Sequence, residues 1–503
     1  MHVTATVHRD FRISIIDDRI YSAFIEHLGR AIYSGIYEPD HPEADDMGFR
    51  KDVLALVRDL KVPTIRYPGG NFVSAYDWKD GIGPRENRPS RLDLAWRTKD
   101  SNQIGVNEFA HWCQRAGIDL MLAVNLGTGT LQDAREYIEY VNHPSGTAWS
   151  DLRRSHGEEN PHDVKMWCLG NEMDGPWQIG HRTAHDYGRI ADETAKALKG
   201  FDPTIETIVC GSSNDDMPTY PDWERIVLEE CYENVDYISL HKYFGNRSGD
   251  TLNFFAKTEV MGRYIKTVGG IIDYVKAKKK AKNDIYICFD EWNVWYHKRY
   301  QEKEALKTWD WPEAPSLLEE DYNFEDALMV ASLINEFVRN SDRVKIACIA
   351  QLVNVIAPIR AERGGPVWRQ TIYWPYQMAS LYGRGEALRV QVDGPTYDAH
   401  VADDVAYLDV AVTRDRNSAT LTAFIVNRHL TEAAEFLMDL CGFQGIRILM
   451  HKVMEGHDLR ATNSASSPDR IAPTQGNGAV LDDGKLKARL GPLSYHVIRL
   501  EVR

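Results

Sequence analysis

Residues 167–177 have the sequence WCLGNEMDGPW, in which an apolar segment stops abruptly at Gly170, Asn171 and Glu172. A buried parallel strand should be apolar along its length, so polar residues grouped at its carboxyl end need an explanation. In a barrel of alternating strands and helices, that end of each strand faces the active site. We therefore expect Glu172 to be a catalytic acid and Asn171 to hold the substrate.

A second segment of this kind is IYICFDEWNVWY, residues 285–296, where alternating apolar residues lead into Asp290 and Glu291. Alone, the first segment is better explained by a strand that ends at a turn with a solvated Glu172, because a Gly-Asn-Glu tripeptide is a weak signal. Two strand-end carboxylates in one barrel form a pair, and paired carboxylates can act as acid and base. The second segment therefore favours catalysis.

The chain from about residue 20 to 380 repeats an apolar strand, a loop and a helix. The predicted strands are 21–26, 62–67, 118–124, 164–170, 206–211, 235–241, 284–291 and 345–351. Residues 50–60 and 325–338 each place apolar side chains on one face, as amphipathic helices do. Eight such units with long loops predict an α/β fold, a (β/α)₈ TIM barrel.

After about residue 385 the helical period fades. The segments YLDVAVTRD, ATLTAFIVNR and SYHVIRLEV alternate in polarity and are separated by Gly, Asn, Asp and Pro, which is typical of an antiparallel β-sandwich. Residues 3–15 alternate in the same way, so we expect this N-terminal strand to join the C-terminal sandwich. The predicted domains are a catalytic barrel at 19–384 and a sandwich formed by 1–18 and 385–503.

Composition narrows the function. A chain of 503 residues exceeds the usual single core. A formal net charge of −15 argues against nucleic acids and anionic membranes as partners, because both select basic surfaces. The one basic run, KAKKKAK at 276–282, is predicted to be the solvated end of a helix that starts near Gly270.

The expected location is the cytoplasm. The N-terminal residues contain no apolar signal segment, and no apolar run is long enough to cross a bilayer. The seven cysteines are widely spread and lie mostly in apolar segments. This pattern predicts buried free thiols in a reducing compartment rather than a disulfide framework.

Other predicted strands also end in polar residues, which we expect to form a ring around the two carboxylates. The ring consists of Glu26, Arg66, Asn71, His241, Tyr243 and Gln351. Each residue alone could be structural, but together they suit a polyhydroxylated ligand. Flat apolar faces that suit the C–H faces of a sugar come from Trp96, Trp177, Trp292 and Trp295, for which core packing is the alternative.

Other chemistries find little support in the motifs. The chain has no HExxH, no pair of CxxC motifs, no GxSxG and no Cys/His cluster with zinc spacing. We therefore expect no cofactor and no metal. Because Asp and Glu are plentiful, a magnesium-dependent barrel enzyme stays open on composition alone.

Six segments, in this order along the chain, resemble glycoside hydrolase family 51, the α-L-arabinofuranosidases. They are FIEHLGRAIYSGIYEP, IRYPGGNFVSAYDWKDGIGP, GNEMDGPWQIGH, YISLHKYF, DEWNVWY and IAQLVNVIAPI. The resemblance implies a barrel with a jelly-roll-like C-terminal sandwich that the N-terminal strand joins. It also implies a retaining mechanism and an intracellular homo-oligomer, a hexamer built as a trimer of dimers.

The resemblance also implies roles for individual residues. Glu172 corresponds to the general acid/base, Glu291 to the nucleophile and Asn171 to the residue that holds the sugar 2-OH. Positions that line the furanose subsite correspond to Glu26, Arg66, Asn71, Tyr243 and Gln351, with His241 close to the acid/base. Trp295 corresponds to an aromatic residue at the sugar ring, and Trp96 and Trp177 to aromatic residues nearer the leaving group.

The expected function is that of a retaining, exo-acting α-L-arabinofuranosidase that acts on oligosaccharides derived from arabinan and arabinoxylan. A β-xylosidase or β-glucanase on the same scaffold is the near alternative, and a non-catalytic sugar-binding barrel is the distant one. Residues 296–320 are long for a barrel loop. We expect this loop to shape the leaving-group side of the site through Trp309 or Trp311.

Overall fold

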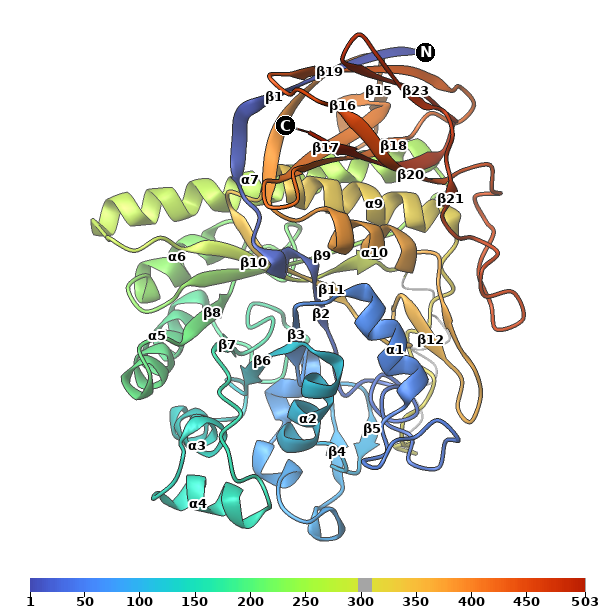
Figure 1. The fold of residues 1–503 in the computed structure, drawn as a ribbon. Helices are drawn as coiled ribbons and strands as arrows, with labels where there is room; N and C mark the ends of the chain where they lie inside the picture. The colour runs from blue at the N-terminus through green and yellow to red at the C-terminus, as the bar shows by residue number, and fades with distance from the viewer. Residues whose placement is uncertain (297–309, 503) are drawn as a thin grey trace.

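Eight parallel strands close into a barrel in the computed structural model, which describes residues 1–296 and 310–502 (Figure 1). The strands are β2 (Ser22–Phe24), β3 (Thr64–Tyr67), β6 (Asp119–Val124), β7 (Met166–Leu169), β8 (Glu206–Cys210), β9 (Tyr237–Phe244), β10 (Tyr286–Val294) and β11 (Val344–Ala350). They pair around the barrel in chain order, and β11 closes it against β2. The predicted (β/α)₈ barrel is confirmed, and every predicted strand overlaps an observed one.

Helices surround the barrel. They are α1 (Lys51–Leu60), α2 (Val106–Ala116), α3 (Leu131–Asn142), α4 (Ala148–Ser155), α5 (Ala184–Phe201), α6 (Asp222–Cys231), α7 (Thr251–Lys279), α9 (Phe324–Arg339) and α10 (Tyr373–Tyr382). Contacts between α5 and α6, α6 and α7, α7 and α9, α9 and α10, and α10 and α1 form much of a ring. The apolar face predicted for 50–60 is buried in α1 against this layer.

The barrel interior is filled from one end by small and medium apolar side chains. They include Met121, Ala123, Met166, Cys168, Ile208, Cys288, Ile346 and Cys348. Successive residues of a strand point to opposite faces, so the residues between these ones pack outward against the helices. Towards the carboxyl ends of the strands the filling becomes polar, which leaves that end of the barrel available for a site.

A ten-stranded sheet packs beside the barrel (Figure 1). Its strands are β1 (His2–Ile15), β14 (Glu386–Asp393), β17 (Leu408–Asp415), β18 (Thr420–Asn427), β19 (Ala434–Cys441), β20 (Arg447–Met454), β21 (Thr474–Gln475), β22 (Ala479–Asp482), β23 (Lys485–Leu490) and β24 (Ser494–Glu501). The N-terminal strand β1 lies between β14 and β19, as predicted. One detail differs: β1 runs parallel to β19, so the sheet is mixed, because chain connectivity and not residue pattern sets strand direction.

The long helix α7 corrects one sequence prediction. It begins at Thr251, where the Asp250 side chain accepts a hydrogen bond from the Asn253 backbone N–H, rather than near Gly270. Gly269 and Gly270 lie inside it, where packing against the barrel offsets their conformational cost of about 0.5–1 kcal/mol each. The basic run does end the helix, where the positive charges of the lysines stabilise the negative end of the helix dipole.

The cysteines are free thiols, as the sequence predicts. All seven cysteines are free, and Cys441 is the one that is not fully buried. Among the helices in the described residues, none combines the length and the apolar character needed to cross a membrane.

The barrel and the sheet are joined by a buried ionic cluster around Asp409 of β17. Arg339, at the end of α9, donates to Asp409, and Arg428 lies 3.1 Å from it. Asn335 donates to the same carboxylate at 3.2 Å. Burial would raise the pKa of Asp409, but the two guanidinium groups outweigh it and hold the pKa below its usual value.

Replacing Asp409 by Asn should lower the free energy of unfolding by about 3–5 kcal/mol, because the buried Arg428 loses its counterion and Arg339, which keeps Glu336, loses one of two. Chemical denaturation followed by circular dichroism measures this change. Asp403→Asn removes an exposed carboxylate and is the matched control. Equal denaturation midpoints for the two variants would contradict the assignment.

Candidate active site

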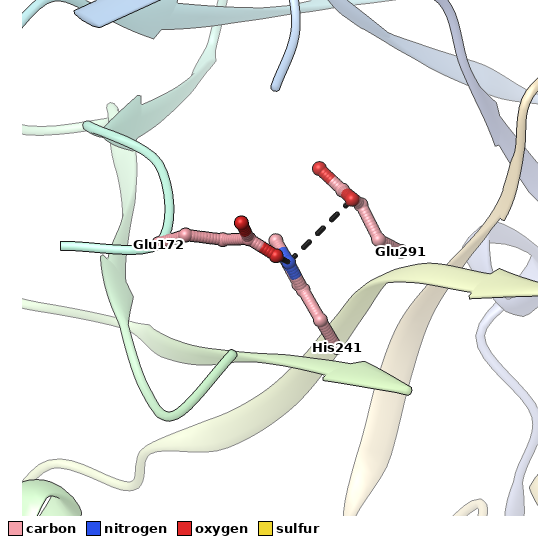
Figure 2. Close-up of side chains that lie close together, drawn as sticks. All are labelled: Glu172, His241 and Glu291. Atoms are coloured by element: carbon pink, nitrogen blue, oxygen red, sulfur yellow. Dashed lines mark hydrogen bonds and ion pairs between the residues drawn. The ribbon is translucent and has the colours of Figure 1, made fainter. Parts of the chain in front are cut away.

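Glu172 and Glu291 face each other at the carboxyl end of the barrel, with His241 between them (Figure 2). One carboxylate oxygen of each, together with a ring nitrogen of His241, lies within 4.8 Å of the others. Carboxylates about 5 Å apart leave no room for a water molecule between them and the anomeric carbon, and they favour a covalent intermediate. The predicted pair therefore exists, at the spacing of a retaining glycosidase.

A bulge in β10 directs Glu291 into the barrel. Cys288 pairs with Ser239 of β9 and Glu291 pairs with His241, so β10 uses one residue more than its neighbour over this stretch. The same irregularity occurs against β11. In a regular strand Asp290 and Glu291 would point to opposite faces, whereas a bulge allows both to point inward. Trp292 consequently points outward against Phe337, so the prediction that it offers a face to sugar is wrong.

Glu172 reaches the site through a tight turn after β7. Gly170 has φ +91°, which favours glycine, and Glu172 itself has φ +43°. A non-glycine residue in this region stores strain of order 1 kcal/mol, which is commonest at functional sites. The turn brings Glu172 Oε1 to 3.0 Å from His241 Nδ1, and Trp177 Nε1 donates to Glu172 Oε2 at 2.6 Å.

Arg66, on β3, is the buried cation of the site. Its Nη1 donates to Glu291 Oε1 at 2.7 Å, its Nη2 donates to Asn171 Oδ1 at 2.6 Å, and its Nε lies 3.1 Å from Asp290 Oδ2. The guanidinium also stacks over Phe24, 4.9 Å from the ring centre. A single side chain thus fixes Glu291, the residue beside it and the residue beside Glu172.

His241 is held as a cation by the carboxylates around it. Its Nε2 lies 3.2 Å from Asp290 Oδ1, and its Nδ1 lies 3.6 Å from Glu291 Oε2. Burial would lower the pKa of His241, but Glu291 and Asp290 raise it well above its usual value. Burial would likewise raise the pKa of Asp290, which Arg66 and His241 instead lower.

Burial and the neighbouring cations shift the pKa of Glu291 in opposite directions. Burial raises the pKa of Glu291 above its usual value, against the attraction of His241 and Arg66. Tyr243 adds a neutral donor, with its hydroxyl 2.8 Å from Glu291 Oε2. Trp295 packs edge-on against Tyr243, with ring centres 5.2 Å apart. The carboxylate is therefore buried but accepts hydrogen bonds from two donors, Arg66 and Tyr243.

Glu26 is a further buried carboxylate of the site. It lies in the part of the cavity that Asn71, Tyr243 and Gln351 also line, which is called the pit below. Its Oε1 accepts from the Phe72 backbone N–H at 2.9 Å and from Trp96 Nε1 at 2.8 Å. Gln351 Oε1 in turn accepts from the Glu26 backbone N–H at 2.9 Å. Burial is the main cause that raises the pKa of Glu26 to about 8.

Gly69 and Gly70 make room for Glu26. A Cβ on Gly70 would lie 2.5 Å from Glu26 Oε2, and Gly69 has φ +126°. No residue with a side chain fits this close approach at either position. The Pro68-Gly69-Gly70 turn after β3 therefore packs directly against Glu26, and Gly70 lines the cavity.

Asn171 is oriented by neighbours as well as by Arg66. Its Nδ2 donates to Gln178 Oε1 at 3.3 Å, and Gln178 donates in turn to Ser74. Gln178 also lies 3.5 Å from the backbone carbonyl of Asn71. These contacts connect the loop after β7 to the loop after β3.

The predicted site residues come together around one cavity of about 1080 Å³. Those that line it are Glu26, Asn71, Trp96, Glu172, Trp177, Tyr243, Glu291, Trp295 and Gln351. Arg66, Asn171 and His241 lie beneath this surface and are buried. Glu291, His241 and Tyr243 lie inside their strands rather than at the strand ends, since β9 and β10 run about three residues beyond the predicted limits.

The donors of Glu172, His241 and Glu291 are close enough to hold a cation. The chemistry of the set does not fit one. A histidine with a strongly raised pKa has no free lone pair for a metal. Arg66 already places a positive charge 2.7 Å from Glu291. The arrangement suits a protonated hydrogen-bond network.

Sequence reasoning missed several residues. Asp290 was seen only as a neighbour of Glu291, because the bulge that turns it inward has no sequence signal. The tip of a distant hairpin, at His400 and Val401, also lines the cavity. Trp309 lies outside the described residues. Trp311 is described and partly exposed, and its contact with substrate stays a prediction.

Two family models match the chain. The Alpha-L-arabinofuranosidase 1 domain matches residues 56–261, and the Alpha-L-arabinofuranosidase C-terminal domain matches residues 290–494. Of the curated relatives, an intracellular exo-alpha-(1→5)-L-arabinofuranosidase from Halalkalibacterium halodurans is 52% identical over 99% of both chains. Another of the same description from Bacillus subtilis is 52% identical over 98% of both.

Solved structures of alpha-L-arabinofuranosidases superpose on nearly the whole chain. A family 51 alpha-L-arabinofuranosidase from Bifidobacterium longum superposes with a TM-score of 0.95 at 41% identity, over 99% of both chains. An alpha-L-arabinofuranosidase from Thermotoga maritima, solved as an arabinose complex, superposes with a TM-score of 0.89 at 33% identity, again over 99% of both.

Replacing Glu26 by Gln should change how stability depends on pH. The folded pKa of about 8 exceeds the unfolded value of 4.5, so the folded protein holds an extra proton between these values. Stability from this group is fully present below 4.5 and declines as pH rises to 8, by up to about 5 kcal/mol. Glu26→Gln should therefore gain stability over the wild type from pH 5 to 9.

Melting temperatures of both proteins across this range test the expectation. Glu43→Gln, which alters an exposed carboxylate, controls for the loss of one charge. A difference between Glu26→Gln and wild type that does not change with pH would show that Glu26 ionises normally in the folded protein.

Replacing Asp290 by Asn should lower the pKa of His241, because one of its two strongest negative neighbours disappears. Nitrogen chemical shifts of ¹⁵N-labelled histidine, assigned by comparison with His241→Gln, report the charge of the ring directly. Ser239→Ala removes a donor to Asp290 but keeps the charge, so it should leave His241 protonated. An imidazolium signal that persists in Asp290→Asn at neutral pH would refute this account.

Proposed function

Since the chain belongs to glycoside hydrolase family 51, the α-L-arabinofuranosidases, we propose that it releases terminal α-L-arabinofuranosyl residues with Glu172 as acid/base and Glu291 as nucleophile. The enzyme is an exo-α-(1→5)-L-arabinofuranosidase, the activity named for its relatives at 52% identity. The observation that carries the proposed roles is the spacing of the two carboxylates, within 4.8 Å.

The two glutamates differ in what surrounds them. Glu291 is buried and receives hydrogen bonds from Arg66 and Tyr243, which favour the carboxylate form. Glu172 lies in the cavity wall beside the partly exposed Trp177 and is reached by His241 rather than by a guanidinium. The anion suits a nucleophile, and the position at the wall suits a group that serves the leaving group and then water.

In the first step, a Glu291 oxygen attacks the anomeric carbon and forms a glycosyl ester. The bond to the leaving-group oxygen breaks, and that oxygen takes the proton of Glu172. Glu291 becomes a neutral ester and Glu172 becomes the carboxylate, while Arg66 and Tyr243 keep the acyl oxygens of Glu291 in place. The leaving group departs as a neutral alcohol.

In the second step, the Glu172 carboxylate removes a proton from water, and the water oxygen attacks the same carbon. The ester bond breaks and returns Glu291 to its anionic form, while Glu172 regains the proton it donated. Two inversions give net retention. No atom or proton is left over, and no metal takes part in either step.

The furanosyl ring occupies the pit formed by Glu26, Asn71, Asn171, Tyr243 and Gln351, whose carboxylate, amide and hydroxyl groups suit sugar hydroxyls. Trp295 offers its face to the ring. Trp96 and Trp177, on the opposite wall, face the leaving group. The positions of Glu26, Asn71, Tyr243, Gln351 and the three tryptophans in the cavity lining support this assignment, with Asn171 buried beneath the lining.

The proposal also covers the location, the domain boundaries and the assembly of the protein. The enzyme acts inside the cell on arabinose-containing oligosaccharides, in line with the word intracellular in the names of its relatives. Residues 19–384 form the catalytic domain, and 1–18 with 385–503 form the second. The assembly is a homo-oligomer, a hexamer as a trimer of dimers, for which sedimentation equilibrium is the measurement.

Variants of the two glutamates should behave differently. Glu172→Ala keeps the nucleophile, so aryl arabinofuranosides with good leaving groups should still react, whereas poor leaving groups should lose about 10²–10⁴ in rate. Added azide should then yield an arabinosyl azide of retained configuration. Glu291→Ala should be inactive with every leaving group, and azide should rescue it with inversion.

Product configuration, read by proton NMR, decides between the roles. A retained azide product from Glu291→Ala, together with leaving-group dependence in that variant, would reverse the assignment. Undiminished hydrolysis in both variants would remove the two carboxylates from the mechanism. Comparison of aryl α-L-arabinofuranosides with β-xylosides and β-glucosides, with and without EDTA, separates the related glycosidases and a metal-dependent reaction.

A further inference from the structure

The cavity is larger than one sugar pit requires and extends away from the carboxylates. Beyond Trp177 its wall is formed by Asn214–Asp216 in the loop after β8, by Gly245–Ser248 in the loop after β9, and by one face of α7. Because the pit is closed by Glu26, Gln351 and Glu291, which are nearly fully buried, this extension is where the leaving group of an exo-acting enzyme lies. This step rests on the proposed function.

Positive charge gathers along the extension. Lys257 and Arg263 project from the face of α7 that also carries Val260, at the i, i+3, i+6 spacing of one helix face. Arg247 adds a third cation from the loop before α7. Three cations in one wall are unexpected in a chain with a net charge of −15.

None of these cations has a carboxylate partner within the described residues. Lys257 Nζ donates to the backbone carbonyl of Gly245 at 2.7 Å, and Arg263 Nη2 donates to the backbone carbonyl of Val401 at 3.0 Å. Arg247 is exposed. Burial lowers the pKa of Lys257, and repulsion from Arg247 and Lys242 lowers it further, so an added anion would relieve a repulsion already present.

The acidic residues of the same wall share one lysine. Lys242 Nζ contacts Asp215 and lies 3.2 Å from Asp216, so this group of three carries one net negative charge. That charge offsets one of the three cations, and the wall keeps an excess of positive charge. The extension thus has an uncompensated positive side that faces the space for the leaving group.

The C-terminal part of the chain fixes this wall. The hairpin of β15 (Thr396–Ala399) and β16 (Ala402–Ala406) leaves the sheet between the paired strands β14 and β17 and packs on α7. Tyr397 donates to the Leu252 carbonyl at 3.1 Å, and the Val401 N–H donates to Asn253 at 3.2 Å. His400 and Val401 at its tip line the cavity.

We propose that Arg247, Lys257 and Arg263 form a leaving-group subsite that binds a carboxylate. The substrates it favours are arabinofuranosides carried on acidic oligosaccharides, with a uronic or aldonic acid residue some distance from the scissile bond. Lysine and arginine recognise carboxylates through charge-assisted hydrogen bonds. Because the subsite lies beyond the reacting atoms, it acts on specificity and not on the chemical step.

Matched pairs of substrates test the proposal. α-(1→5)-L-Arabino-oligosaccharides of two to four residues can be oxidised at the reducing end to the aldonate or reduced to the alditol, which differ in charge but share the same non-reducing end. For at least one length, the wild-type kcat/KM should be about fivefold to tenfold higher for the aldonate at low salt. The preference should approach one in about 0.5 M NaCl, because salt screens the attraction.

Variants locate the effect. The double variant Lys257→Met/Arg247→Gln, which keeps Arg263, should lower the aldonate preference to less than half its wild-type value and leave hydrolysis of the neutral 4-nitrophenyl α-L-arabinofuranoside unchanged. Lys266→Met removes an exposed lysine of the same helix that lies outside this cavity and should keep the wild-type preference. Arg247→Gln alone, an exposed position, gives a smaller loss if the double variant folds poorly.

The outcomes are distinct. A wild-type ratio of one or less at every length, or a preference that is undiminished in the double variant, overturns the subsite. Failure of the wild type to hydrolyse the neutral aryl arabinofuranoside overturns the proposed function instead. A preference equally lost in Lys266→Met would reduce the effect to net charge and also overturn the subsite.

Discussion

Two consecutive carboxylates, Asp290 and Glu291, point into the same barrel, and the site is arranged around the need to neutralise them. The bulge in β10 makes this possible, since a regular strand would bury one against the helices. Arg66 contacts both carboxylates, and His241 is protonated because it lies between them. Removing one charge would leave the others buried without a partner, which is far more costly than keeping the network.

This network also explains why the glutamates can have different tasks. Asp290, whose pKa is lowered by Arg66 and His241, supplies a negative charge that holds both cations. In the proposed mechanism Glu291 therefore changes from anion to ester without releasing them. Glu172 is outside this group and contacts it only through His241. Glu26, at the other pole of the pit, faces a backbone N–H and an indole instead of a cation, and burial therefore keeps its proton at neutral pH.

The barrel and the identity of most site residues could be predicted from sequence because they depend on local pattern. Apolar strands that end in Glu26, Arg66 or Asn171 are visible without any tertiary information. The bulge was not, because the sequence of Cys288–Trp292 carries no mark of an extra residue, which shows only in the pairing of β10 with β9. The start of α7 was misplaced because Gly269 and Gly270 suggest a boundary that tertiary packing overrides. The direction of β1 against β19 depends on connectivity, which residue pattern does not encode.

The β15–β16 hairpin lay beyond prediction for a different reason, and it changes what the second part of the molecule does. Its sequence, near Tyr397 and Val405, alternates like any strand pair of the sheet, so nothing local indicates that it leaves the sheet. In the structure the hairpin packs on the first turns of α7, the helix that follows β9, the strand that carries His241 and Tyr243. A sheet that only supported the barrel would not need to reach the cavity. Because His400 and Val401 line the same cavity as Glu172 and Glu291, the C-terminal part of the chain contributes to the wall of the site that the barrel builds.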